Sequence, residues 1–209
     1  FCGSSTAHSE NSVRSFGHNL TATANVPRDK ACALGFQVVA CGWQEYLGIG
    51  SSPFLWSYYS MDNAYVRYRW LASEDTAYAL QIAHFKTRTS ATRYDMESTW
   101  LYAIKTSSLA PHYTLHWNIQ YAYFFNDRKP FSLRRPDVKR EPWQVNITTL
   151  HELKMVNGYY LMGELGILGL NDHYPQVHSG ASLQYRSNSW LIQFGYTVSG
   201  TLQALFSPT

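Results

Sequence analysis

Apolar and polar side chains alternate along most of this chain, and the alternation is most regular over residues 112–125. Odd positions there, such as Tyr113, are apolar or aromatic, whereas most even positions, such as His112, are polar. Because successive side chains of a strand point to opposite faces, this period of two predicts a β-strand with one apolar and one polar face. The predicted strand is longer than most strands of globular proteins and long enough to cross a membrane when tilted.

The same period recurs along the chain and predicts a meander of eleven strands, with no helix of three turns. The predicted strands cover residues 19–26, 33–42, 45–51, 63–71, 76–86, 97–106, 112–125, 143–154, 159–170, 177–186 and 190–198. Asn157-Gly158 between two of them is a strong hairpin signal. Residues 1–15 are small and polar and predict a flexible N-terminal segment, which leaves residues 16–209 as a single domain.

The face opposite the apolar one carries charged or amide side chains in strand after strand, which predicts a polar interior. The candidates for lining it are Arg67, Arg69, Lys105, His116, Asn118, Gln120, Asn146, Glu152, Glu164, Gln184 and Arg186. The apolar face is predicted to meet lipid. The candidates for this contact are Trp70, Trp100, Tyr102, Leu115, Trp117, Ile119, Tyr121, Ile147, Leu165, Trp190, Ile192 and Phe194.

The predicted connections alternate between tight turns and longer loops, of which residues 126–142 form the longest and most basic. Aromatic residues such as Trp43, Trp70 and Trp143 gather near predicted strand ends. Short turns on one rim, long loops on the other and aromatic girdles are typical of outer-membrane barrels. In these features, residues 16–199 resemble bacterial outer-membrane β-barrel proteins. The resemblance implies an all-β antiparallel meander that closes as a transmembrane β-barrel of 10–12 strands in the bacterial outer membrane.

The predicted strand number departs from this resemblance, because single-chain bacterial barrels have an even number of strands and the pattern gives eleven. One expectation is a twelve-stranded barrel whose final strand lies beyond residue 209. The other is a ten-stranded barrel in which one weak segment, 19–26 or 45–51, is not a strand.

Composition narrows the function classes. Charged residues make up 15% of the chain, against roughly 25% in an ordinary soluble domain. No apolar run reaches the about 18 residues of a transmembrane helix, and a formal charge of +3 does not indicate a nucleic-acid partner. The three cysteines lack CxxC spacing and predict neither a disulfide framework nor a metal site. Cys2 lies in a sequence like the start of a bacterial lipoprotein, although Phe1 before it fits such a cleavage site poorly.

The histidines are the main candidates for chemistry. His112 and His116 share a strand face but lie roughly 13 Å apart, too far to hold one metal ion. With His151 and His178, they are expected to line the interior or the membrane interface. No zinc-protease motif or GxSxG elbow occurs, so no catalytic residue, metal or cofactor is predicted. A lipid hydrolase, the minor alternative, would need a hydroxyl such as that of Thr114 or Ser98 beside a histidine.

The basic loop predicts a binding surface for lipopolysaccharide phosphates or an acidic partner, with a simple solvated loop as the alternative. Its candidates are Arg128, Lys129, Arg134, Arg135, Lys139 and Arg140. The expected function is non-enzymatic: a small porin-like channel or a structural component, with the lipid bilayer as its main partner. One alternative is a barrel subunit that docks to an envelope or surface complex through loops 52–62 and 126–142. Another is a soluble lipocalin-like ligand-binding barrel.

Overall fold

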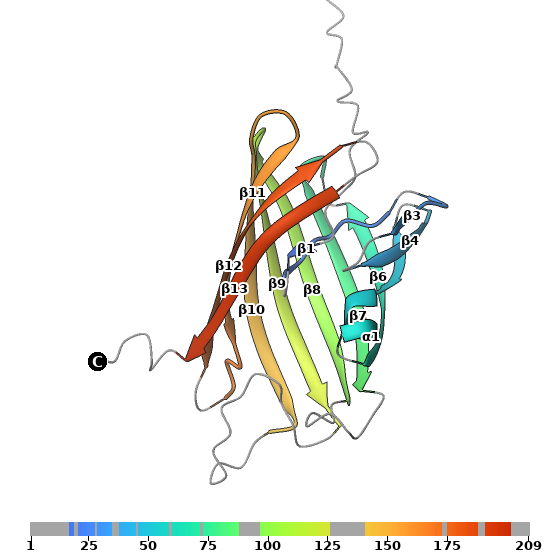
Figure 1. Cartoon of the computed structure of the whole chain (residues 1–209), viewed down its shortest axis with the longest axis vertical. Helices are drawn as coiled ribbons and strands as arrows, with labels where there is room; N and C mark the ends of the chain where they lie inside the picture. The colour runs from blue at the N-terminus through green and yellow to red at the C-terminus, as the bar shows by residue number, and fades with distance from the viewer. Residues whose placement is uncertain are drawn as a thin grey trace, which may run out of the picture.

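The computed structural model is an all-β fold built around one large antiparallel sheet (Figure 1). It describes residues 17–18, 21–27, 29–34, 38–44, 46–58, 60–71, 73–87, 97–125, 141–172, 175–187 and 191–201. The short strands β1 (Gly17–His18) and β2 (Thr21–Ala22) form a separate two-stranded sheet. A single short helix, α1 (Pro53–Tyr58), interrupts the strands of the described chain.

The large sheet has eleven strands in the order of the sequence, from β3 to β13. Their bounds are β3 (Cys32–Leu34), β4 (Val39–Trp43), β5 (Leu47–Ser51), β6 (Met61–Leu71), β7 (Thr76–Thr87), β8 (Glu97–Ala110), β9 (Tyr113–Phe124), β10 (Trp143–Lys154), β11 (Tyr159–Leu168), β12 (Gln176–Arg186) and β13 (Leu191–Thr201). Each strand pairs antiparallel with the next. The sheet is curled, with β8 and β9 behind β13 in Figure 1, and β3 and β13 are its edge strands. The meander is therefore as predicted.

Two segments differ from the predicted strands. Residues 21–26, expected as part of the first strand of the sheet, lie outside it. Residues 33–42, expected as one strand, instead contribute to the hairpin of β3 and β4, so the large sheet still has eleven strands. The alternation of threonine and alanine over residues 21–24 is typical of a strand. These side chains are also small enough for the segment to pack against the inner face of the sheet instead of joining it.

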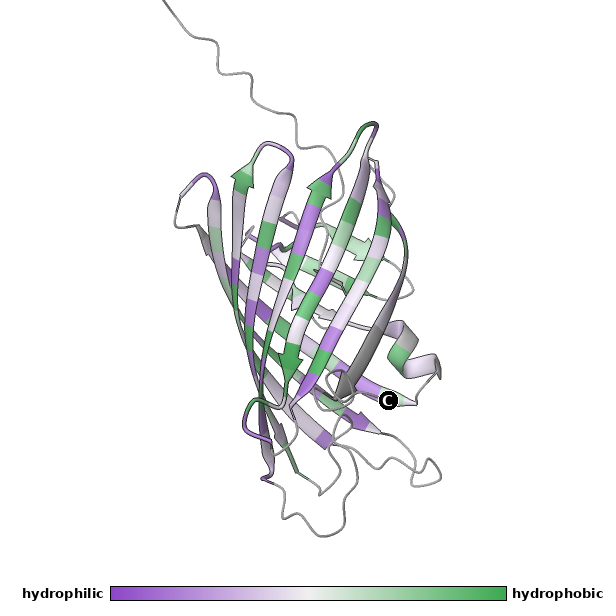
Figure 2. Cartoon of the chain, turned by 90° about the vertical axis from the view of Figure 1, so that its left-hand side faces the viewer, coloured by the Kyte–Doolittle hydropathy of each residue, from purple (hydrophilic) through white to green (hydrophobic). Residues whose placement is uncertain are grey.

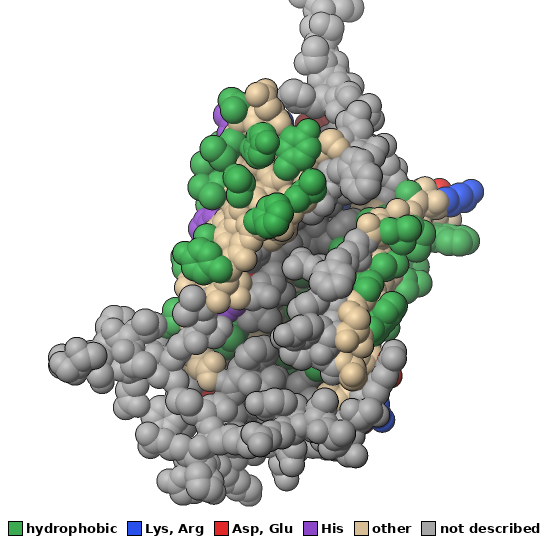
Figure 3. All heavy atoms as spheres, in the orientation of Figure 1, with side chains coloured by type: hydrophobic (Ala, Val, Ile, Leu, Met, Phe, Trp, Pro, Cys, Tyr) green, Lys and Arg blue, Asp and Glu red, His purple; other side chains and the backbone are tan. Residues whose placement is uncertain are grey.

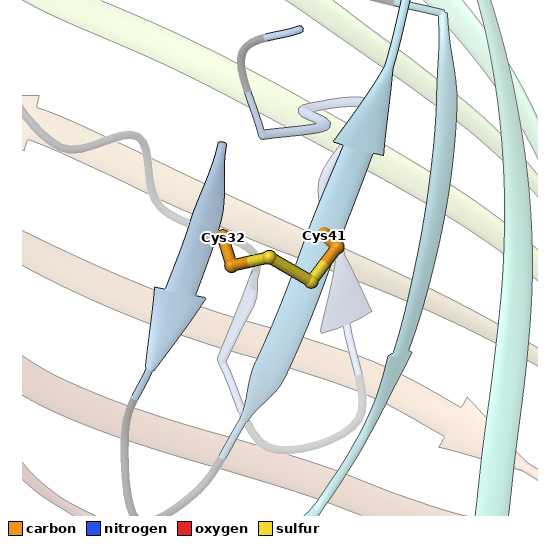
Figure 4. Close-up of a disulfide and its surroundings, with 2 residues drawn as sticks. All are labelled: Cys32 and Cys41. Carbon is orange, nitrogen blue, oxygen red and sulfur yellow. A yellow bond between two sulfur atoms is a disulfide. The ribbon is translucent and has the colours of Figure 1, made fainter. Parts of the chain in front are cut away.

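A disulfide joins Cys32 to Cys41, which face each other directly across β3 and β4 (Figure 4). The prediction of no disulfide was wrong, because the spacing of the two cysteines reveals nothing about the hairpin that makes them cross-strand neighbours. The bond ties the short edge strand β3 to its neighbour.

The two faces of the large sheet have opposite polarity. The outer face exposes large apolar side chains on successive strands, including Leu80, Ile119 and Phe194, which are 56%, 57% and 76% exposed. Figure 2 shows the resulting alternation of hydrophobic and hydrophilic positions along the strands, and Figure 3 shows hydrophobic side chains gathered on the surface. Most buried side chains on the inner face are polar, and small apolar clusters lie between them, one of them around Trp100 and Phe124.

The predicted faces of β8 are reversed. Trp100 and Tyr102 point inward, where they stack on each other with ring centroids 6.1 Å apart, whereas Lys105 is exposed on the outer face. Both faces of this strand carry apolar residues, so the period of two does not determine which face is buried. The inward choice gives the Trp100 Nε1–H a buried acceptor, Ser98 Oγ, at 3.0 Å.

Candidate functional site: the polar inner face and the inner segment

Residues 21–26, which we call the inner segment, lie against the inner face of the large sheet (Figure 1). At the start of the segment, β2 pairs with β1, with His18 opposite Thr21. The side chains of Thr21, Thr23, Ala24 and Val26 are at most 1% exposed. The inner segment therefore occupies part of the interior that the sequence predicts to be polar.

The side-chain amide of Asn118 on β9 forms hydrogen bonds with both main-chain groups of one residue in the inner segment, Ala22. Its Oδ1 accepts the Ala22 N–H at 3.0 Å, and its Nδ2 donates to the Ala22 carbonyl at 2.7 Å. Two residues further on, the Ala24 N–H donates to Thr106 Oγ1 of β8 at 3.0 Å. These bonds satisfy buried main-chain groups that have no place in the sheet ladder.

Two charged side chains hold the ends of the inner segment. Glu164 of β11 accepts the Thr21 N–H at 2.5 Å, and Arg67 of β6 donates to the Asn25 carbonyl at 2.7 Å. Gln81 orients the guanidinium, because its Oε1 accepts hydrogen bonds from Arg67 Nε at 2.8 Å and Nη2 at 2.6 Å. The inner segment is thus bound by groups from four strands that span most of the sheet.

A buried contact between a carboxylate and an imidazole lies beside Thr21. Glu164 Oε2 is 2.9 Å from His178 Nε2 on β12, and both side chains are almost fully buried. Glu164 therefore joins the inner segment and His178 through its two oxygens. Hydrogen bonds to both oxygens are what allow a carboxylate to stay buried.

A larger polar cluster lies toward the tight-turn end of the strands. Arg186 of β12 binds both oxygens of Glu152 on β10, with Nη1 2.8 Å from Oε1, and its guanidinium lies 3.8 Å from the centre of the Tyr160 ring. His116 Nε2 is 3.8 Å from Glu152 Oε2, and His116 Nδ1 is 2.8 Å from Thr106 Oγ1. Through Thr106, this cluster also contacts the inner segment.

Thr106, His116 and Glu152 follow the order of hydroxyl, imidazole and carboxylate in a hydrolase triad, but His116 Nε2, at 3.8 Å from Glu152 Oε2, has no hydrogen-bond partner among the described residues. The hydroxyl beside His116 is neither Thr114 nor Ser98, the two candidates from sequence. Because Thr106 Oγ1 already accepts the Ala24 N–H, the backbone of the inner segment occupies the approach to it.

A chain of side-chain amides lies between β9 and β10. Gln144 donates to Asn146 at 2.8 Å, Asn146 donates to Gln120 at 3.3 Å, and Gln120 donates to Thr148 at 3.2 Å. Asn146 Oδ1 also accepts the Gly169 N–H at 2.9 Å. The described inner face therefore combines neutral hydrogen-bonding groups with paired charges.

The structure places most predicted site residues on the expected face of the sheet. The predicted interior residues that point inward are Arg67, Arg69, His116, Asn118, Gln120, Asn146, Glu152, Glu164, Gln184 and Arg186, and Lys105 is the exception. The predicted lipid-facing residues that point outward are Trp70, Leu115, Trp117, Ile119, Tyr121, Ile147, Leu165, Ile192 and Phe194, whereas Trp100 and Tyr102 point inward. Outside the described residues lie Trp190, Arg128, Lys129, Arg134, Arg135, Lys139 and Arg140.

The four histidines do not form one cluster. His116 and His178 are buried on the inner face, His112 is exposed, and His151 lies on the outer face with Nδ1 2.7 Å from the Tyr113 hydroxyl. Across the described ranges, no group of three or more His, Cys, Asp or Glu side chains could hold a metal ion. None of the helices described is long and apolar enough to span a membrane.

Sequence reasoning missed the inner segment and its binding residue Thr106. Residues 21–24 carry only threonine and alanine, and this lack of any large side chain was the one available signal. The contacts themselves join residues 143 and 96 positions apart, as in Glu164 with Thr21 and Asn118 with Ala22. No protein-family model, curated protein or solved structure matches this chain.

Proposed function

We propose that this chain is a bacterial outer-membrane β-barrel with a porin-like interior that its own inner segment keeps closed. The observation that carries the proposal is the inverted polarity of the sheet. Leu80, Ile119 and Phe194 on the outer face are all more than half exposed, whereas Glu164 and Asn118 on the inner face are fully buried. Monomeric soluble proteins rarely expose apolar surface on such a scale, and a polar interior within an apolar band is the arrangement of membrane barrels.

The polarity also separates this proposal from a soluble lipocalin-like barrel. A soluble barrel that binds an apolar ligand would place its apolar side chains inside and its polar side chains in water. Here, buried Gln120, Asn146 and Gln184 occupy the inside. The disulfide between Cys32 and Cys41 fits the same proposal, because disulfides persist in oxidising compartments such as the bacterial periplasm.

Closure of the sheet is part of the proposal. Open sheet edges do not occur in lipid, because their backbone groups would have no hydrogen-bond partner. All pairings in the large sheet are antiparallel, so the first and eleventh strands, β3 and β13, run in the same direction. One further strand between them, antiparallel to both, would give a closed barrel of twelve strands. Single-chain bacterial outer-membrane barrels have such an even number of strands.

The first test is extraction and gel migration. Expressed in a Gram-negative host, the protein is expected in the outer-membrane fraction, soluble only in detergent, with different gel migration before and after boiling. A folded monomer in detergent-free buffer would overturn the membrane proposal.

The second test is electrical. In planar bilayers, the intact protein is expected to give no steady open current, because the inner segment occupies part of the interior and is proposed to block it. Removal of that segment after specific cleavage is expected to produce a steady current. Silence both before and after removal would support a structural component rather than a channel, and would overturn the porin-like part of the proposal.

A further inference from the structure

We propose that the inner face is a binding site for the backbone of a short polypeptide, and that the inner segment is its exchangeable resident ligand. The inference deepens the proposed function and rests on it for the site's place in a barrel. It assigns the interior a ligand class, a short peptide with small side chains that is a strand at Thr21–Ala22 and bends at Ala24.

The first argument is what the inner face recognises. Asn118, Glu164 and Thr106 accept hydrogen bonds from main-chain N–H groups of the inner segment. Asn118 and Arg67 donate to its main-chain carbonyls. In contrast, the buried hydroxyl of Thr21 has no hydrogen-bond partner among the described residues. Main-chain groups are common to every peptide, so these bonds select a backbone conformation rather than one sequence.

The second argument is what the inner face excludes. Ala24 is fully buried in an apolar cluster with Ala77, Ala79 and Ile104. A Cβ atom added to Gly48 would lie only 3.2 Å from Val26 Cγ1, so Val26 fits closely over that glycine. The site therefore favours small side chains at position 24 and a residue no larger than valine at position 26.

The third argument is how the inner segment is attached. Its strand β2 belongs to the separate two-stranded sheet and has no ladder pairing with the large sheet. The segment can thus leave without breaking any ladder hydrogen bond of the eleven strands. Water in a polar interior could then satisfy the exposed amide, carboxylate and guanidinium groups. A resident peptide held this way is replaceable by another peptide.

The experiment uses the full chain with a specific protease site inserted between Asp29 and Lys30, which are both exposed. After folding in detergent and cleavage, a fluorescent synthetic peptide of residues 17–27 is added, and its binding is followed by anisotropy. We expect saturable binding that the unlabelled peptide competes away. Uncleaved protein is the control and should take up the peptide much more slowly.

Two modified peptides test the mode of recognition without changing the protein. An ester in place of the Ala24 amide removes the donor to Thr106 and should weaken binding about tenfold, the effect of losing roughly 1.4 kcal/mol. An ester at Asn25, whose N–H points to Thr23 within the segment, is the matched control and should change affinity less. An Ala24→Trp peptide should not compete.

No uptake after cleavage, or equal binding of the Ala24→Trp peptide, would overturn the inference. These outcomes are distinguishable from failure of the proposed function, because peptide binding is measured in detergent and does not depend on membrane insertion. If the protein proves soluble but still exchanges the peptide, the peptide-binding site is supported and the outer-membrane location is overturned.

Discussion

Arg186 is an example of a buried charged residue that depends on its partners in this interior. Its guanidinium, 9% exposed, binds Glu152 and lies over the Tyr160 ring. Desolvating two charges is costly, so such a pair contributes little net stability compared with apolar residues of similar size. Removal of one partner is different, because it leaves the other charge buried without compensation.

We therefore expect Arg186→Met to lower the free energy of unfolding by about 3–5 kcal/mol, measured by urea unfolding in lipid vesicles. The double variant Arg186→Met with Glu152→Gln should show a smaller decrease in the free energy of unfolding, because no uncompensated charge is left in the interior. Glu97→Gln is the matched surface control. The Lys86–Glu97 pair is 3.1 Å apart but well exposed, so this change should cost about 1 kcal/mol or less. A similar loss in Arg186→Met and Glu97→Gln would contradict the prediction.

At the scale of elements, β3 to β5 form the weakest part of the large sheet. These strands have 3, 5 and 5 residues, whereas β8 has 14. The hairpin of β3 and β4 has the Cys32–Cys41 disulfide to replace the ladder hydrogen bonds that its short strands lack. A crosslink between such close neighbours closes a small loop and acts mainly on the local structure.

We expect Cys32→Ser with Cys41→Ser to lower stability by about 2–3 kcal/mol. The larger effect should be local: backbone amides of β3 to β5 should lose protection in hydrogen exchange, whereas those of β9 and β10 keep theirs. Chemical reduction of the wild type should reproduce the pattern. Uniform loss of protection across all strands would show that the disulfide supports the whole sheet instead.

The elements also show what sequence alone can predict. The β9 strand, Tyr113–Phe124, agrees closely with the predicted 112–125, because one of its faces is apolar throughout and the other mostly polar. In β8, both faces carry large apolar side chains, Leu101 on one and Trp100 and Tyr102 on the other, so the alternation does not predict which face is buried. The inner segment has the alternation of a strand, and only contacts with residues about a hundred positions away place it elsewhere.

At the scale of the whole molecule, the main question is which solvent meets the outer face. In water, an exposed isoleucine contributes little, and its replacement by a charged residue is usually within about 0.5 kcal/mol of neutral. In lipid, the same replacement is costly at the middle of the bilayer and mild near its rim. The depth dependence of a charged substitution therefore distinguishes the two environments more directly than the amount of apolar surface does.

Ile119 and Leu153 provide a matched pair for this measurement. Both are outward and exposed, at 57% and 44%, but Ile119 lies at the middle of β9 and Leu153 one residue before the end of β10. We expect Ile119→Arg to lower the free energy of unfolding in lipid vesicles by about 2–4 kcal/mol, and Leu153→Arg by about 1 kcal/mol or less. Far-ultraviolet circular dichroism of each variant in detergent checks that it still folds. If both arginines are tolerated equally, the outer face meets water, and the curled sheet must then belong to a soluble protein whose polar interior is occupied by its own inner segment.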